Sequence, residues 1–321
     1  MKKAYILISL FSALAVSTSC DHITNPFPAA YNTDMDTTIY PGVWSDYLAN
    51  ELPDWTIPND NPNRNAIIED YTGHNCSNCP QAATIAHDLH VGNPNRVYVA
   101  SIHSSSVGLS AFQELNIPAG YTINFTNENA LDFGYYFGTT LAGSGFFGNP
   151  SGTVNRKIEG TEYFYAAGFW STKVNEILAL PLRVAIKAKV NYYPSTKGLF
   201  LHTEIENLDS GGLSDSDLGI FVFLIEDTLV GPQNVSSTYT PDYVHRDIMR
   251  GNISGFTWGR DVDDGDLVNG KYYLDYSYYV PDQLAPDGQA TTYNADNMHL
   301  LVMVYDKVTQ EVHQVIKKKI E

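Results

Sequence analysis

The sequence predicts a mixed α/β domain followed by an all-β domain. Strand-like and helix-like segments alternate between residues 66 and 180, which is typical of a sheet covered by helices. After Pro181 the pattern changes to strict alternation of apolar and polar residues, which indicates half-buried β-strands. The chain has 321 residues, more than one hydrophobic core usually supports, and 43% of them are hydrophobic. We therefore expect two folded domains, at 64–180 and 181–321.

The N-terminus has the features of a secretory signal peptide. The stretch MKKAYILISLFSALAVSTSC combines two lysines, an apolar segment from Ala4 to Val16 and small residues before Cys20. The apolar segment is too short to span a membrane, so residues 1–19 are expected to be removed. A cysteine directly after small residues resembles a bacterial lipoprotein cleavage site and predicts lipidation of Cys20, although Ser17 stands where Leu is usual. The alternative is ordinary cleavage near Ala15 and a soluble secreted product.

Residues 20–63 are predicted to be a lipid-anchored tether. The segment is rich in Asn, Thr and Asp and contains many of the prolines, a composition typical of linkers. Its second half also carries aromatic residues that are unusual in a free linker. We expect that half to lie against the domain that follows, through Tyr40, Trp44, Tyr47 and Trp55.

The first domain is expected to contain, in order, a strand, a helix, a strand, a helix, a hairpin and a helix. AIIEDY and RVYVASIH have the apolar character of buried strands, and Pro80 suits the first turn of the helix between them. A strand, helix and strand in succession imply parallel pairing of the two strands. Glu159-Gly160 marks a two-residue hairpin turn. The expected ranges are 66–71, 80–92, 96–103, 128–141 with Thr126 as its cap, 153–158, 161–166 and 168–180.

The second domain is expected to be an antiparallel, immunoglobulin-like β-sandwich. In LRVAIKAKVNYY the apolar residues occupy every second position and the intervening positions are mostly polar. LFLHTEIEN, LGIFVFLIED, KYYLDYSYYV, MHLLVMVYD and EVHQVIKKKI repeat the strand signal with little helix between them.

Three cysteines are present, and lipidation of Cys20 would leave Cys76 and Cys79 with only each other. A bridge between them closes so short a loop that it contributes only about 2 kcal/mol, against about 3 for a fifteen-residue loop. A structural staple is therefore their weakest explanation, and an oxidising compartment favours redox use. A metal site with His74, His87 and His90 would depart from zinc-finger spacing, so no metal is expected. A vestigial pair on a binding scaffold stays an alternative.

The order of elements resembles the thioredoxin-like fold over about residues 64–180. Cys76-Ser77-Asn78-Cys79 follows the first strand, and Asn149-Pro150-Ser151 precedes the hairpin. The resemblance implies that Cys76 is the nucleophile, that Cys79 resolves the mixed disulfide, and that the Pro150 loop faces an extended peptide. The partners would be thiols or disulfides of envelope or extracellular proteins, with no cofactor. Glu69 and Asp70 would raise the thiol pKa, and His74 is the nearest counterweight.

Two further clusters carry charge. His245, Arg246 and Arg250 lie near Trp258 and could contact an anionic ligand, or they could simply pack a loop. DVDDGDLVNG resembles a calcium loop, but its glycine comes one place early and Tyr272 stands where the bidentate Glu should be. The net charge of −17 argues against binding of nucleic acid or of anionic lipid surfaces. Contact with the membrane is therefore expected through the lipid anchor alone.

Four stretches together resemble one family of Gram-negative surface lipoproteins, the outer membrane protein 28-related family. They are the lipoprotein-like leader, IIEDYTGHNCSNCP, NPSGTVNR and YVHRDIMRG. The resemblance implies an outer-membrane address, on the periplasmic or the cell-surface face, and a thioredoxin-like domain joined to a β-domain. It implies no particular reaction. The cysteines favour thiol-disulfide exchange, and the alternative is a non-enzymatic surface protein for adhesion or ligand binding.

Overall fold

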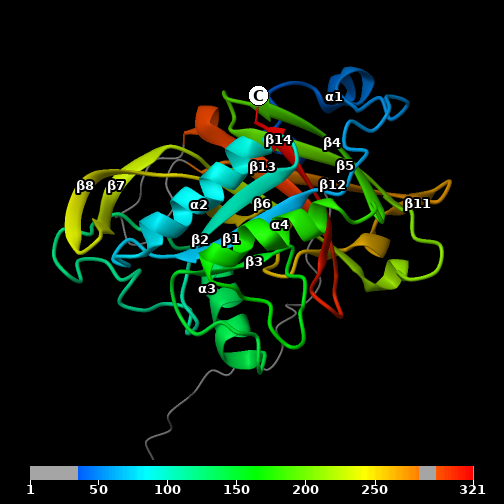
Figure 1. Cartoon of the computed structure of the whole chain (residues 1–321). Coiled ribbons are helices and arrows are strands. Elements are labelled where there is room, and N and C mark those ends of the chain that lie inside the picture. The colour runs from blue at the N-terminus through cyan, green and yellow to red at the C-terminus, as the bar shows by residue number, and fades with distance from the viewer. Residues whose placement is uncertain (1–34, 282–293, 321) are drawn as a thin grey trace, which may run out of the picture. The chain divides into compact units, whose positions relative to one another are not determined.

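The structure is a computed structural model that describes residues 35–281 and 294–320. The signal peptide and Cys20 lie outside the described residues. The fold is mixed α/β, with several β-sheets and few helices (Figure 1). Its centre is an eight-stranded sheet in the order β14-β13-β6-β9-β2-β1-β3, with β10 paired to β6.

The cysteine motif lies in the first half of this sheet. Strands β1 (Ala66–Thr72) and β2 (Val97–His103) run parallel and are joined through helix α2 (Cys79–Gly92). β3 (Ser151–Val154) pairs antiparallel with the other edge of β1. Every residue of these three strands is buried, because the sheet is covered on both faces. The predicted parallel pairing is thus confirmed.

Helices cover both faces of β1 and β2 (Figure 1). α2 and α4 (Trp170–Leu178) pack on one face, and α3 (Glu128–Tyr135), continued by the π-helical turn η2 (Tyr136–Thr140), packs on the other. The cap of α3 is Asn127 and not Thr126, because the Asn127 side chain accepts a hydrogen bond from the Ala130 amide. The expected hairpin is reduced to single bridges, which join Glu159 to Glu162 and Gly152 to Tyr165.

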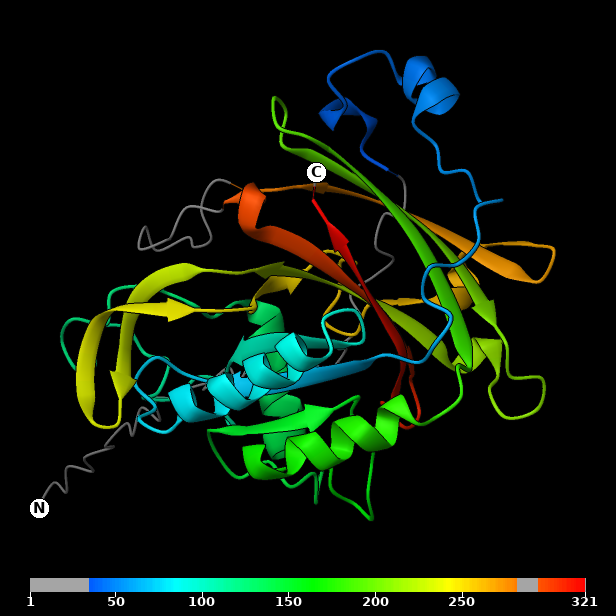
Figure 2. The same ribbon diagram turned by 45° about the horizontal axis from the view of Figure 1, so that its top comes forward.

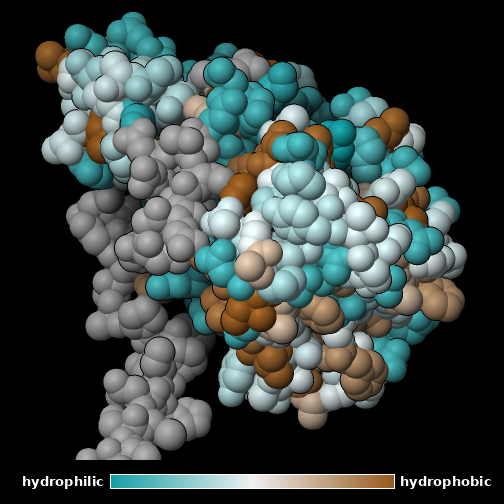
Figure 3. Space-filling view, turned by 90° about the vertical axis from the view of Figure 1, so that its left-hand side faces the viewer, coloured by the Kyte–Doolittle hydropathy of each residue, from teal (hydrophilic) through white to brown (hydrophobic). Residues whose placement is uncertain are grey.

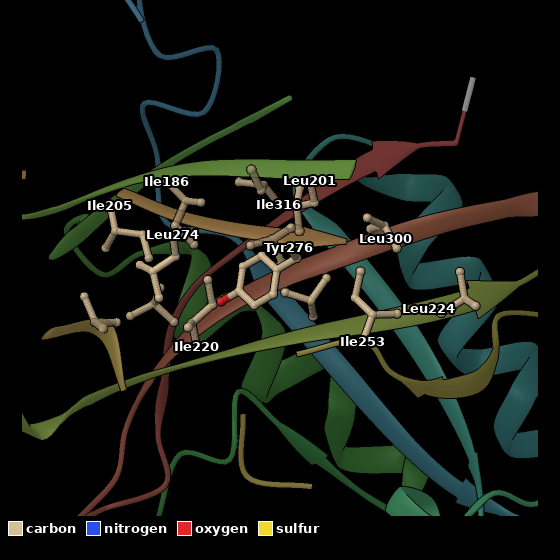
Figure 4. Packing of buried hydrophobic residues seen from close by; sticks show 14 of the residues in the cluster. Ile186, Leu201, Ile205, Ile220, Leu224, Ile253, Leu274, Tyr276, Leu300 and Ile316 are labelled. Carbon is tan, nitrogen blue, oxygen red and sulfur yellow. The ribbon is translucent and has the colours of Figure 1, made fainter. Parts of the chain in front are cut away.

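The second half contains a face-to-face pair of antiparallel layers. β4 (Val184–Tyr193), β5 (Gly198–Asn207), β11 (Asp266–Val268) and β12 (Lys271–Tyr279) form a four-stranded sheet. It packs on β6 (Leu218–Glu226), β13 (Met298–Asp306) and β14 (Val312–Lys319) around an aliphatic core (Figure 4). The remaining elements are β7 (Leu229–Val235), β8 (Thr238–His245), β9 (Ile248–Asn252), β10 (Arg260–Asp261), α1 (Trp44–Asn50), and short 3₁₀ turns at Thr37–Ile39, Ala167–Phe169, Asp215–Asp217, Val262–Asp264 and Ala295–Asn297.

Strand β9 joins the two halves. It pairs parallel with β2 at Ser101 and Ile248, and antiparallel with β6. Strands from 64–180 and from 181–321 therefore share one sheet.

The second half of the expected tether is folded. The side chain of Tyr47 is fully buried, and its hydroxyl lies 2.6 Å from His202 Nε2 on β5. Trp44 stacks on the Tyr47 ring with centroids 4.4 Å apart. This segment lies against the four-stranded sheet of the second half (Figure 2), and so its position differs from the expected one beside 64–180.

A buried ion pair fixes the centre of the large sheet. Glu69 on β1 accepts hydrogen bonds from Arg156 Nε at 2.7 Å and from its second guanidinium nitrogen at 2.6 Å, and both side chains are fully buried. The guanidinium carbon lies 4.6 Å from the ring centroid of Phe133 and 4.8 Å from that of Phe221. The pair therefore connects β1 to α3 and to β6.

Replacing Arg156 with Met should lower the free energy of unfolding by about 3–5 kcal/mol, because Glu69 would stay buried without its counter-ion. The double variant Glu69→Leu, Arg156→Met should recover a large part of that loss. Urea unfolding of Arg156→Met, Glu69→Leu and the double variant gives the coupling free energy between the two residues. A loss below about 1 kcal/mol in Arg156→Met would contradict the role assigned to the pair.

Candidate functional site

The cysteine pair lies where β1 leads into α2. β1 ends at Thr72, a short loop carries Cys76, and α2 begins at Cys79 with Pro80 in its first turn. The two sulfurs form a disulfide. The helix starts at Cys79, as expected from Pro80, so the amide-rich end of α2 lies directly beside the bridge. Such a helix end favours a negative charge, here that of a cysteine thiolate.

Both cysteines are buried, with 2% of Cys76 and 1% of Cys79 exposed. The β7–β8 hairpin, from the second half of the chain, lies against their loop (Figure 2). Gln233 Nε2 donates to the carbonyl oxygen of Cys76 at 3.1 Å, and the Asn234 amide donates to that of His74 at 2.7 Å. Sequence reasoning missed this contact, which joins residues more than 150 positions apart and leaves no local signal.

A cavity of about 100 Å³ opens between α2 and β8. Cys79 and Asp70 line it together with His103, His245 and Asp247. The inner cysteine and a carboxyl group of β1 therefore line one and the same cavity.

Asp70 is a fully buried carboxyl group of this cavity. Neither carboxyl oxygen has a hydrogen-bond partner among the described residues. Burial raises the pKa of Asp70 to about 7. The adjacent Glu69 points to the opposite face of β1, where Arg156 compensates its charge. Of the two carboxyl groups expected to act on the cysteines, only Asp70 faces them.

Three histidines near the pair, His74, His103 and His245, are buried. Burial lowers the pKa of His245 to about 3 and holds the pKa of His103 well below its usual range. His74 stacks on Tyr121 with ring centroids 5.0 Å apart, and burial lowers its pKa as well. His74 therefore supplies no positive charge to offset a thiolate at pH 7.

The other predicted site residues, Pro150, His245, Arg246 and Arg250, lie in three different places. Pro150 precedes β3, whose first residue pairs with Tyr71 near the carboxyl end of β1. Pro150 and the cysteine loop therefore lie at the same end of these strands. The peptide bond before Pro150 is cis. His245 and Arg246 line the cavity beside Cys79. Arg250 does not line it, because its buried side chain pairs with Glu226 at 3.0 Å. The three basic residues thus do not form one exposed cluster.

Within residues 35–281 and 294–320, no group of three or more His, Cys, Asp or Glu side chains has an arrangement that could hold a metal ion. Asp261, from the calcium-like stretch, pairs with Lys307 at 2.8 Å. No helix in the described part of the chain is long and apolar enough to cross a membrane.

Comparisons with known proteins identify a family. The sequence model of outer membrane protein Omp28 matches residues 142–321, more than half of the chain, in a region that begins after the cysteine pair. No curated protein sequence matches the chain.

Among solved structures, HBP35 of Porphyromonas gingivalis superposes with a TM-score of 0.57 at 13% identity, over 80% of this chain and 76% of its own. This similarity shows a shared fold. A domain of the outer membrane lipoprotein Omp28 from Porphyromonas gingivalis aligns over 43% of this chain and 88% of its own, at 24% identity and a TM-score of 0.29. A protein of Agrobacterium tumefaciens aligns over 78% of this chain and 92% of its own, at 11% identity and a TM-score of 0.43.

Asp70→Asn should change how stability depends on pH. A carboxyl group whose pKa is raised by folding binds more protons in the folded chain, so its contribution to stability falls as the pH rises from about 4 to about 7. Asn cannot ionise and lacks this loss. Relative to the wild type, Asp70→Asn should therefore gain about 2–3 kcal/mol between pH 5 and pH 8. Urea unfolding at both pH values measures the gain.

Asp88→Asn is the matched control, because Asp88 is exposed on α2. Its stability relative to the wild type should stay constant between the two pH values. A constant difference for Asp70→Asn as well would show that Asp70 keeps an ordinary pKa.

Proposed function

The chain belongs to the Omp28 family of outer membrane proteins, and on this premise we propose that it is a lipid-anchored thiol-disulfide exchange protein. The observation that carries the proposal is the position of Asp70. A buried carboxyl group without a partner among the described residues is costly, and here it lines the same cavity as Cys79. Such perturbed groups concentrate at functional sites. A bridge that served only as a staple would need no such group.

The arrangement of elements supports a thioredoxin-like first half. β1 lies between the parallel β2 and the antiparallel β3, and the cysteines lie between β1 and the helix that follows it. Pro150 lies at the same end of these strands as the cysteine loop. The face-to-face antiparallel layers support a sandwich in the second half, although three of its strands belong to the sheet of the first half.

The exchange would run in two balanced steps. A thiolate of a partner dithiol attacks the Cys76 sulfur, the Cys76–Cys79 bond breaks, and Cys79 leaves as a thiolate. The second partner thiolate then attacks the mixed disulfide and releases Cys76. The partner loses two electrons and two protons and becomes a disulfide, and the two cysteines gain them. The reverse sequence reduces a partner disulfide.

Asp70 would move the proton that this reaction requires. With a pKa of about 7, its carboxyl group is partly protonated at neutral pH and can donate a proton to the leaving Cys79 thiolate. In the reverse direction its carboxylate accepts the proton from the Cys79 thiol before that thiol attacks. Cys76 is assigned the contact with the partner, because Cys79 lines the cavity beside Asp70.

Cys79→Ser should accumulate mixed disulfides with envelope proteins. The free Cys76 thiolate attacks a partner disulfide, and no resolving thiol is left to release the product. The adducts should disappear under reductant and exceed those of Cys76→Ser by at least about tenfold. Non-reducing electrophoresis with mass spectrometry measures them.

The double variant Cys76→Ser, Cys79→Ser is the control for adducts through other cysteines. Both single variants lose the same short bridge, so their stabilities should be nearly equal. Equal and negligible adducts in two folded single variants would sink the exchange proposal and favour the surface-binding alternative.

The lipid anchor is a separate part of the proposal. Cys20→Ser should release the chain from membranes, because the acylation site is lost while the leader still directs export and is cleaved upstream. Ser17→Ala is the matched control and should stay in the outer-membrane fraction. Cell fractionation followed by mass measurement of the N-terminus distinguishes the two. Continued outer-membrane fractionation of Cys20→Ser would overturn lipidation at this residue.

A further inference from the structure

We propose that the β7–β8 hairpin is a cover which occupies the main-chain positions where an extended polypeptide binds to the cysteine loop. The substrate class inferred below rests on the proposed exchange function, whereas the cover itself does not. Cys76 is only 2% exposed, and its own carbonyl oxygen and those of His74 and Ser77 accept hydrogen bonds from the hairpin. Exchange therefore requires the hairpin to leave.

The contacts between the hairpin and the loop follow the pattern of an added strand. The Asn234 amide donates to the carbonyl oxygen of His74 at 2.7 Å, and the Ser236 amide donates to that of Ser77 at 3.0 Å. Asn234 belongs to β7 and Ser236 to the turn directly after it, and both direct their amides to the cysteine loop, much as the edge of an added strand does. The Gln233 side chain adds bonds to the carbonyl oxygens of Cys76 and Gly73, at 3.1 and 3.3 Å.

The hairpin is attached in a way that permits opening. β7 and β8 pair only with each other within the described ranges, and an isolated two-stranded hairpin is marginally stable. Its base is held by a small apolar cluster of Phe125, Leu229 and Ile248. Beyond the base, Val230, Tyr239 and Val244 are exposed. Figure 3 shows the side of the molecule on which the hairpin lies, where hydrophobic and hydrophilic residues are mixed. The tip is held by its bonds to the cysteine loop and by contacts of Tyr239 with Gly120 and Tyr121.

The same groups define the class of substrate. When the hairpin leaves, the carbonyl oxygens of His74 and Ser77 lose their donors beside the disulfide. Two amides of an extended polypeptide, two residues apart, can replace them. We therefore expect the site to prefer a cysteine in an extended or unfolded segment, because a cysteine within a helix has its neighbouring amides already bonded.

The test is the rate at which dithiothreitol reduces the Cys76–Cys79 disulfide in the full chain. Asn234→Pro removes the amide that donates to His74, and proline is tolerated on a strand edge whose amide points away from its neighbour. Asn234→Ala keeps that amide but removes the long side-chain bonds of Asn234 Nδ2 to Asn75 in the cysteine loop, so the main-chain contribution is the difference between Asn234→Pro and Asn234→Ala. Reduction should be about threefold to tenfold faster in Asn234→Pro than in Asn234→Ala, and about threefold to tenfold faster in Gln233→Ala than in the wild type.

Alkylation and mass spectrometry of the tryptic peptide 65–96, which contains both cysteines and excludes Cys20, measure the reduction. Equal rates in Asn234→Pro, Gln233→Ala and the wild type would overturn the cover. Circular dichroism checks that each variant is folded. If Asn234→Pro does not fold, Gln233→Ala alone decides between the two results.

The substrate class is tested with disulfide-linked peptides and the Cys79→Ser variant. An extended peptide should form a mixed disulfide faster than the same peptide N-methylated at every second residue around its cysteine, because methylation removes the amides that would replace Asn234 and Ser236. Equal rates would overturn the substrate class. Faster reduction of Asn234→Pro by dithiothreitol without any adducts to envelope proteins would support the cover and refute the exchange function.

Discussion

The buried ion pair between Glu69 and Arg156 is the interaction on which the rest of the structure depends. Neither charge could remain in an apolar core without the other, and the guanidinium is further held against rings from α3 and β6. The neighbouring Asn155 bonds to the main chain of Ile67 on β1 and of Val312 on β14. Two adjacent residues after β3 therefore bind β1 to strands that the sequence places in a different domain.

The ion pair also decides the chemistry on the opposite face of β1. Successive side chains of a strand point to opposite faces, so fixing Glu69 toward Arg156 fixes Asp70 toward α2 and Cys79. A register shift of one residue would exchange their environments. One carboxyl group is thus paired with a guanidinium. Its neighbour, whose pKa burial raises to about 7, can carry a proton at neutral pH.

Local patterns predicted the elements well, because periodicity and turn residues act over a few positions. The strand expected at 66–71 is β1, and the helix expected from Pro80 is α2. The alternation after Pro181 likewise corresponds to β4 and the strands that follow. The hairpin expected after Thr153 is weaker, because the turn signal at Glu159-Gly160 is not supported by long strands.

The arrangement in space was less accessible from the sequence. The insertion of β9 beside β2 depends on contacts between residues almost 150 positions apart, for which one sequence contains no periodic signal. The sequence does suggest that Glu69 and Asp70 have unusual environments, since two carboxyl groups in the buried run AIIEDY need partners. Which of them would find Arg156 depends on the register of β1 and β3.

The number of hydrogen bonds between the hairpin and the cysteine loop determines whether the disulfide can be exposed locally or only by global unfolding. Two main-chain bonds, two bonds of the Gln233 amide and the long bonds of the Asn234 side chain to Asn75 join them. At about 1 kcal/mol net for each, with the two long Asn234 bonds counted as one, breaking them costs about 5 kcal/mol. That cost leaves roughly one molecule in five thousand open at any moment. A disulfide sealed in a core would be exposed only by global unfolding, at about 5–15 kcal/mol. The contacts seen here are few enough for an extended partner, which makes the same main-chain bonds, to displace the hairpin without unfolding the sheet beneath it.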